Sequence, residues 1–156
     1  MNETMLRGNQ KVSIGSYKCW GKNRTEQGGG GIATAIVNEY KDSVINAGEG
    51  SGEDEYLVTR IGAFNPALCI VNCYGEQRKM NIEDIEAKWM RLKRELDEIV
   101  SRNEFCLLIG DLNKLVGCDE YGVPGNHPEV SPGGKLLREL LMTGKWFLVN
   151  GMGWRW

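Results

Sequence analysis

Asp111 and Asn113 are the residues of this sequence best suited to chemistry, and they follow a short apolar run. The run Phe105–Ile109 has no charged or amide side chain, and Gly110 then precedes the polar pair. The run predicts a buried central strand, and alternation along it would place Asp111 and Asn113 on one side if extended geometry continues. Such a pair can hold a water, a phosphate or a hydrated metal ion, and Gly110 would leave room for a ligand to approach. A strand followed by a local side-chain-to-backbone turn fits the same residues equally well.

Three further runs predict the strands that would position this pair. They combine β-branched, aromatic and small side chains and span Gly31–Val37, Tyr56–Ile61 and Ala67–Tyr74. The turns between them carry the glycines of Gly48–Gly52 and the dipeptide Asn65-Pro66. Turns of these kinds favour antiparallel pairing of the strands that they join.

A helix is predicted between the third of these strands and the run that precedes Asp111. Its apolar side chains recur every three or four residues and form one stripe, which predicts a helix that covers a sheet. Asn81 is the expected N-cap, with Asp84 in the position of a capping-box partner. The stripe consists of Ile82, Ile85, Trp89, Leu92, Leu96 and Ile99.

The carboxyl-terminal third predicts a loop, a second helix and a last strand. The segment Gly117–Gly134 is rich in glycine and proline and indicates a loop. An amphipathic helix is expected over Lys135–Met142, ended by Gly144, and a strand over Trp146–Asn150.

Length and composition indicate one globular domain or a large piece of one. The chain has 156 residues, 41% of them hydrophobic and 26% charged, which is enough apolar material for a core. The formal net charge of −2 gives no general electrostatic attraction to nucleic acid. No apolar run is long enough to span a bilayer, and no secretory signal precedes the first strand. An odd number of cysteines without a CxxC pair indicates a reducing, intracellular compartment.

Five segments, in order, carry a resemblance to a known family. They are Asn2–Thr4, Gly28–Ile32, Val71–Tyr74, Gly110–Asn113 and the stretch from Gly133 to Asn150. With these segments the sequence resembles the endonuclease/exonuclease/phosphatase superfamily, and most closely the apurinic-type endonuclease domain of non-LTR retrotransposons and its domesticated relatives. The most specific segment is Gly110–Asn113, which resembles the GDxN motif of that family.

The resemblance implies a fold and a chemistry. The implied fold is α+β, part of a two-sheet β-sandwich flanked by helices. The implied reaction is hydrolysis of a DNA phosphodiester with Mg²⁺ or Mn²⁺, for which one or two carboxylates suffice as protein ligands. Glu3 would bind the metal and Asp111 would orient or deprotonate the attacking water. Asn113 would hydrogen-bond the phosphate or that water, and Tyr74 would donate to a phosphate oxygen.

The sequence also departs from the family. We expect residues 1–156 to form a single endonuclease-like domain that lacks the family's first strand and its carboxyl-terminal Asp-His segment. His127, in a turn-rich loop, stands too early to replace that histidine. Gly75 and Glu76 follow Tyr74 where the family usually has a proline nearby, which puts a negative charge where a phosphate should approach. Cleavage by this chain is therefore expected to be weak or lost.

Two alternatives remain open from the sequence. One is a non-catalytic domain derived from such an endonuclease, which self-associates through open sheet edges or binds a partner. The other is a phosphatase of the same superfamily that acts on small phosphoesters. A chain that acts on DNA would be nuclear, and no membrane partner is expected.

Overall fold

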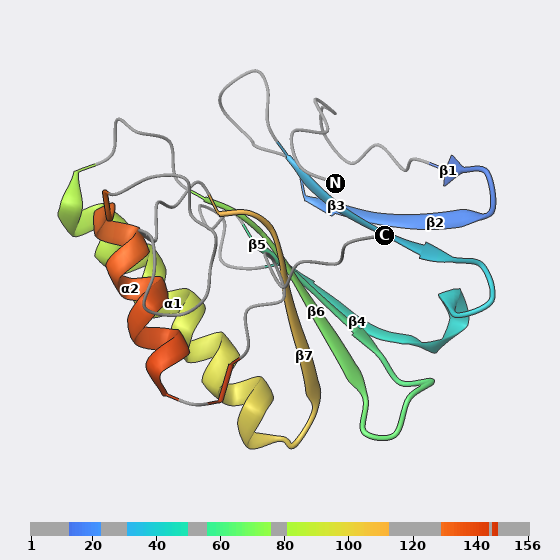
Figure 1. Ribbon diagram of the computed structural model, residues 1–156. Helices are drawn as coiled ribbons and strands as arrows, with labels where there is room; N and C mark the ends of the chain where they lie inside the picture. Colours follow the sequence, from blue (N-terminus) through green and yellow to red (C-terminus); the bar gives the residue numbers. More distant parts are fainter. Residues whose placement is uncertain are drawn as a thin grey trace, which may run out of the picture. The chain divides into compact units, whose positions relative to one another are not determined.

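The computed structural model describes residues 13–22, 31–49, 56–75, 81–112, 129–143 and 145–146, and all structural statements below concern these residues. Within them the chain is α+β, with a three-stranded sheet, a four-stranded sheet and two α-helices (Figure 1). The α+β class expected from the sequence is therefore confirmed.

The three-stranded sheet is wholly antiparallel and has the order β1-β2-β3. Its strands are β1 (Ser13–Ile14), β2 (Tyr17–Lys22) and β3 (Ile32–Val37). The strand predicted at Gly31–Val37 is confirmed as β3, but its pairing with the Tyr56 strand is wrong. β3 pairs with β2, which the sequence analysis did not predict, so it belongs to a different sheet from Tyr56–Ile61.

The four-stranded sheet has the order β4-β5-β6-β7. A short 3₁₀ helix, Lys41–Ser43, leads into β4 (Val44–Glu49), which pairs antiparallel with β5 (Tyr56–Ile61). The predicted antiparallel pairing of β5 with β6 (Leu68–Tyr74) is confirmed. β6 and β7 (Phe105–Asp111) run parallel, because the chain crosses over through a helix between them.

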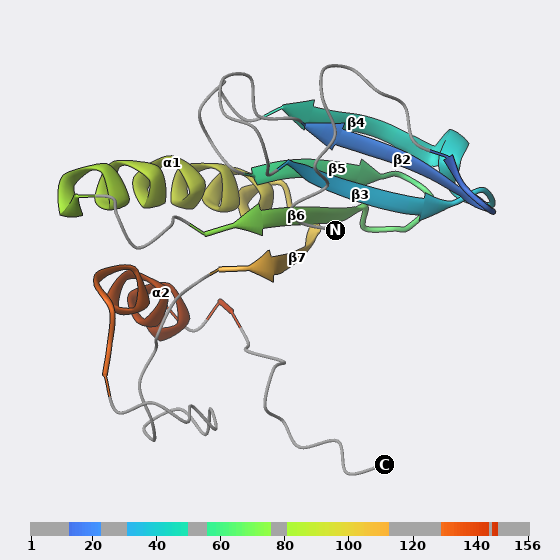
Figure 2. The same cartoon turned by 90° about the horizontal axis from the view of Figure 1, so that it is seen from above.

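β3 lies against β5 and β6, and the apolar core of this part of the chain lies at that contact. Figure 2 shows the strands of the two sheets running alongside one another. The buried aliphatic side chains of these strands include Ile32, Ile36, Leu57, Ile61 and Val71. Burial of these side chains supplies the main stabilisation of the sheet pair.

β7 differs from its prediction as a buried central strand. It is the last strand of the described sheet, and Phe105, Leu107 and Ile109 are 60%, 43% and 37% exposed. These three side chains alternate along the strand and so share one face. A short apolar run has the same composition in a central strand and at a border, which is why the sequence did not distinguish the two.

The first helix, α1, spans Ile82–Ser101 and confirms the predicted stripe and cap. The side-chain oxygen of Asn81 accepts a hydrogen bond of 2.7 Å from the Asp84 backbone N–H, as an N-cap does. The stripe is buried from Trp89 to Ile99, but Ile82 in the first turn is 57% exposed.

The second helix, α2, spans Pro132–Met142 and begins three residues before its prediction. Ser131 is the N-cap and accepts a 3.1 Å hydrogen bond from the Gly134 N–H, while Pro132 takes the first helical position. Proline is suited to that position, since the first N–H groups of a helix have no partner within it. The predicted end at Gly144, most of the predicted last strand and the loop from Gly117 to Pro128 lie outside the described residues.

The chain divides into two compact units. One unit contains both sheets and the part of α1 from Arg94 onward, and the other contains α1 up to Lys93 together with α2. Helix α1 is continuous across the boundary. Neither described helix combines the length and the apolar character that a membrane crossing requires.

Candidate functional site

Tyr74 and Asp111 are paired residues at the carboxyl ends of two neighbouring parallel strands. Their Cα atoms are partners in the β6–β7 register, and Tyr74 is the last residue of β6 as Asp111 is of β7. Adjacent strands lie about 4.8 Å apart, so the two residues are immediate neighbours. Asp111 is exposed and Tyr74 is partly exposed, which leaves both accessible to a solute.

The backbone around this pair is fixed by a short hydrogen bond. The N–H of Gly75 donates to the carbonyl oxygen of Asp111 at 2.6 Å, directly after the last pair of the ladder. Gly75 is buried, and a β-carbon on it would lie 1.8 Å from the carbonyl oxygen of Leu112. The two strand ends therefore stay in register beyond Tyr74 and Asp111.

Gly110 has a structural role that the sequence did not indicate, and the room it would leave for a ligand stays a prediction. An added β-carbon would lie 1.9 Å from the carbonyl oxygen of Cys73 on β6. Its φ of +125° is also a conformation that side chains disfavour. Glycine at this position lets two backbones approach each other, and the neighbour that it accommodates is β6.

The other predicted site residues cannot be placed. Glu3 and Asn113, together with His127, lie outside the described residues. The structure therefore brings together Tyr74 and Asp111 from the predicted set and gives no position for the rest.

The described oxygen atoms at the site are of the type that a hard cation prefers as ligands. Mg²⁺ accepts a single carboxylate when waters complete its coordination, and the Asp111 carboxylate at an exposed strand end meets that requirement. The described residues contain no group of three or more histidine, cysteine, aspartate or glutamate side chains that could hold a metal. Any further protein ligand, such as Glu3, would come from outside the described ranges.

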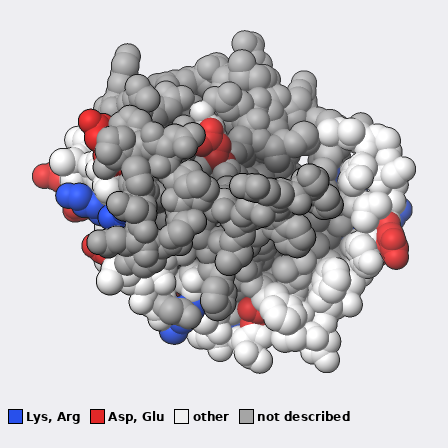
Figure 3. All heavy atoms as spheres, in the orientation of Figure 1, with Lys and Arg blue, Asp and Glu red and all other residues white. Residues whose placement is uncertain are grey.

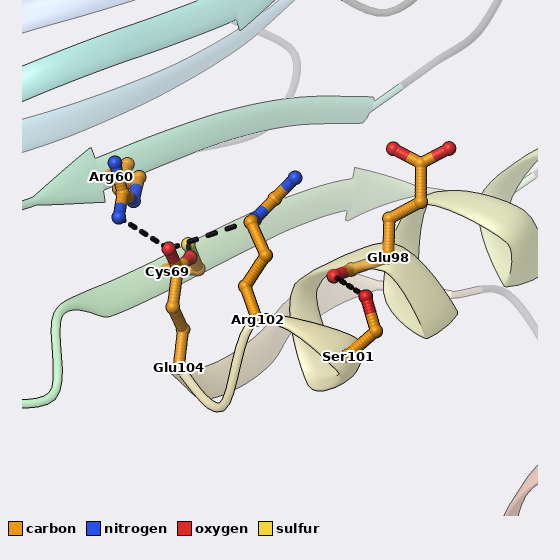
Figure 4. A network of polar contacts seen from close by, with 6 residues as sticks. All are labelled: Arg60, Cys69, Glu98, Ser101, Arg102 and Glu104. Atoms are coloured by element: carbon orange, nitrogen blue, oxygen red, sulfur yellow. Dashed lines mark hydrogen bonds and ion pairs between the residues drawn. The ribbon is translucent and has the colours of Figure 1, made fainter.

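A second polar cluster, which the sequence analysis missed, surrounds the buried side chain of Glu104 (Figure 4). Glu104 is 4% exposed in its side chain and forms ion pairs with Arg60 of β5 and, at 3.6 Å, with Arg102. The thiol of Cys69 donates a 2.8 Å hydrogen bond to the other carboxylate oxygen. A signal in the sequence was Arg60, a charged residue in an otherwise apolar and hydroxyl-bearing strand.

The charges around Glu104 set its protonation. Burial alone would raise the pKa of Glu104, but the hydrogen bonds from Cys69 and Arg60 and the positive charges of Arg60 and Arg102 lower it overall. Glu104 is thus an ionised structural acid, because its neighbours favour the charged form.

The thiols next to Glu104 are held protonated. Cys69 and Cys106 are Cα partners on β6 and β7. Burial, the hydrogen bond to Glu104 and its negative charge raise the pKa of Cys69 to about 12. Burial and the charge of Glu104 raise the pKa of Cys106 to about 12 as well. Since the thiolate is the reactive form of cysteine, this cluster is not a nucleophilic site.

On the face drawn in Figure 3, described acidic and basic side chains lie close to one another. The Tyr74–Asp111 pair is the candidate site, because both residues lie at one end of the sheet and neither is buried. No protein-family model matches this chain, and a search of curated proteins finds no significant match.

Proposed function

We propose that this chain is an endonuclease-like domain that hydrolyses DNA phosphodiesters weakly, with Mg²⁺ or Mn²⁺, in the manner of the endonuclease domain of non-LTR retrotransposons. The proposal includes the two-sheet sandwich of the endonuclease/exonuclease/phosphatase superfamily. The observation that supports it is the register of Tyr74 with Asp111. Two residues to which the resemblance assigns phosphate chemistry, far apart in sequence, are neighbours at one end of a sheet.

The two side chains have complementary roles in this reaction. The Asp111 carboxylate accepts a hydrogen bond or a proton from the attacking water, and the Tyr74 hydroxyl donates to a phosphate oxygen. Glu3 would hold the metal, which neutralises charge on the phosphate when bound. Asn113 would donate to the phosphate or accept from the water. Glu76, next to the site in sequence, opposes the approach of an anion, so we expect a slow rate.

Nicking of supercoiled plasmid DNA and of a duplex with one abasic site tests this proposal. Cleavage should require Mg²⁺ or Mn²⁺ and stop with EDTA. Asp111→Asn should lower the rate by about 100-fold or more, since a lost general base costs two to four orders of magnitude. Tyr74→Phe should lower it by about tenfold, since it removes one donor to the phosphate.

A matched control is Glu86→Gln, which removes an exposed acid from α1 and should leave nicking unchanged. Cleavage that survives Asp111→Asn at full rate would refute the assignment, as would the absence of any metal-dependent nicking by the purified protein. A parallel assay with nucleotides and inositol phosphates separates DNA cleavage from the phosphatase alternative.

A second candidate function is self-association without catalysis. It is favoured by the apolar row Phe105, Leu107 and Ile109 on β7, the last strand of the described sheet. Strands at a sheet border pair readily with a second copy when no charge or proline prevents it, and Phe105–Gly110 contains neither. The oligomeric state in solution distinguishes this candidate from a monomeric enzyme.

A further inference from the structure

Asn72 is a buried carboxamide in β6, a strand whose other side chains are apolar or aromatic. It lies in β6 and is 1% exposed. Asparagine is disfavoured in strands and seldom fully buried, because its polar atoms lose their hydrogen bonds to water. A buried carboxamide therefore needs partners inside the protein.

One hydrogen-bond partner of Asn72 belongs to the other sheet. The side-chain Nδ2 of Asn72 donates a buried hydrogen bond of 3.0 Å to the carbonyl oxygen of Ala33 on β3. Apolar contact between sheets has no strong direction, whereas a hydrogen bond fixes both distance and angle. This bond therefore constrains how β6 lies along β3.

Asn72 lies close to the candidate site along β6. It precedes Tyr74 by two residues on β6, so the two side chains leave the same face of the sheet, about 7 Å apart along the strand. Its register partner on β7 is Ile109, two residues before Asp111. The residue that donates the hydrogen bond to Ala33 is thus two residues along the strand from the Tyr74–Asp111 pair.

We propose that Asn72 is a positioning residue for Tyr74. Its hydrogen bond to Ala33 holds the carboxyl end of β6 against β3 and thereby fixes where the Tyr74 hydroxyl lies relative to the Asp111 carboxylate. This inference rests on the proposed function, in which that relative placement matters. Asn72 itself is too deeply buried to touch a substrate.

The decisive variant is Asn72→Leu, which has nearly the same volume and lacks the donor. We expect it to fold at some loss of stability, because leucine fills the same space but the Ala33 carbonyl oxygen loses this donor. Nicking at saturating DNA should fall by about tenfold with little change in apparent KM, since small errors in placement slow the chemical step more than they weaken binding. Combined with Tyr74→Phe, the same change should cost much less, because the two residues act together.

A spectroscopic readout tests the placement without any activity. The protein is labelled with 3-fluorotyrosine, and the ¹⁹F signal of Tyr74, one of five tyrosines, is assigned by its loss in Tyr74→Phe. Asn72→Leu should shift or broaden that signal. Thr59→Val is the matched control, because Thr59 is equally buried and its hydroxyl has no hydrogen-bond partner among the described residues, so the Tyr74 signal should stay in place.

Asn72→Ser serves if the leucine variant does not fold, since serine is small and too short to reach Ala33. An unchanged Tyr74 signal in a folded Asn72 variant overturns the inference, and so does an unchanged rate at saturating DNA. Absence of nicking by the wild-type protein would refute the proposed function alone, because the ¹⁹F comparison would still decide whether Asn72 positions Tyr74.

Discussion

Gly110 of β7 lies so close to Cys73 of β6 that a β-carbon on it would stand 1.9 Å from the Cys73 carbonyl oxygen. Gly110 directly precedes Asp111, and Cys73 directly precedes Tyr74. The close approach therefore occurs one residue before the paired site residues. Any change that separates the two backbones at this point would separate Tyr74 from Asp111 too.

Gly110→Ala should destabilise the protein by about 3 kcal/mol, since it combines a backbone clash with a strained φ of +125°. Urea unfolding followed by circular dichroism measures this. Gly15→Ala is the control, because Gly15 also has a positive φ, of +53°, but no atom of the described residues lies within 4 Å of an added β-carbon. That variant should lose only about 1 kcal/mol. Equal losses in the two variants would show that crowding against Cys73 is unimportant.

Removing the charge of Glu104 should make the free energy of unfolding less dependent on pH in the acidic range. The lowered pKa of Glu104 stabilises the fold at pH values above its ordinary value of 4.5, and that contribution disappears as the pH falls through the lowered folded-state pKa. At pH 7, Glu104→Gln should cost about 2 kcal/mol, because Arg60 and Arg102 lose their buried partner. Below pH 4 the gap in unfolding free energy between wild type and variant should narrow.

The measurement is urea unfolding at several pH values between 3 and 7. Glu98→Gln, which removes an exposed acid from α1, should show a small loss at most. A constant gap between wild type and Glu104→Gln over the whole range would mean that Glu104 is not held ionised by its neighbours.

The apolar row on β7 predicts the outcome of a self-association experiment. If two copies join through β7, light scattering should show a dimer, and Leu107→Lys should convert it to a monomer because it places a charge in the row. Met90→Lys changes a side chain on α1 that is also exposed and should leave the dimer intact. A monomer at every concentration would argue against this second candidate.

Local sequence patterns predicted the elements that depend on residues close together in the sequence. The apolar stripe and the Asn81 cap define α1, and the turn around Asn65-Pro66 defines the β5–β6 hairpin. The strands β2 and β4 were missed because Gly21, Asn46 and Gly48 are weak strand formers. They become strands through pairing with β3 and β5, and such pairing is a tertiary effect.

The candidate site was predictable in part, because a local sequence pattern marks the position of each of its two residues. Tyr74 and Asp111 each end an apolar run, and parallel strands joined by a helix place such ends at one edge. The Glu104 cluster was not predictable, because its acid is paired with Arg60 from a distant strand. The Asn72–Ala33 bond depends on which sheet β3 joins, and the sequence pattern did not indicate that.

The parallel pairing of β6 and β7 has a consequence for how the candidate site comes into existence during folding. The twenty residues of α1 lie between the two strands, so no local hairpin can bring the Tyr74 hydroxyl next to the Asp111 carboxylate. Tyr74 and Asp111 become neighbours only when the loop between them, which includes α1, has closed. Catalytic competence would then report on completion of the fold, and a partly folded chain would be inert toward DNA.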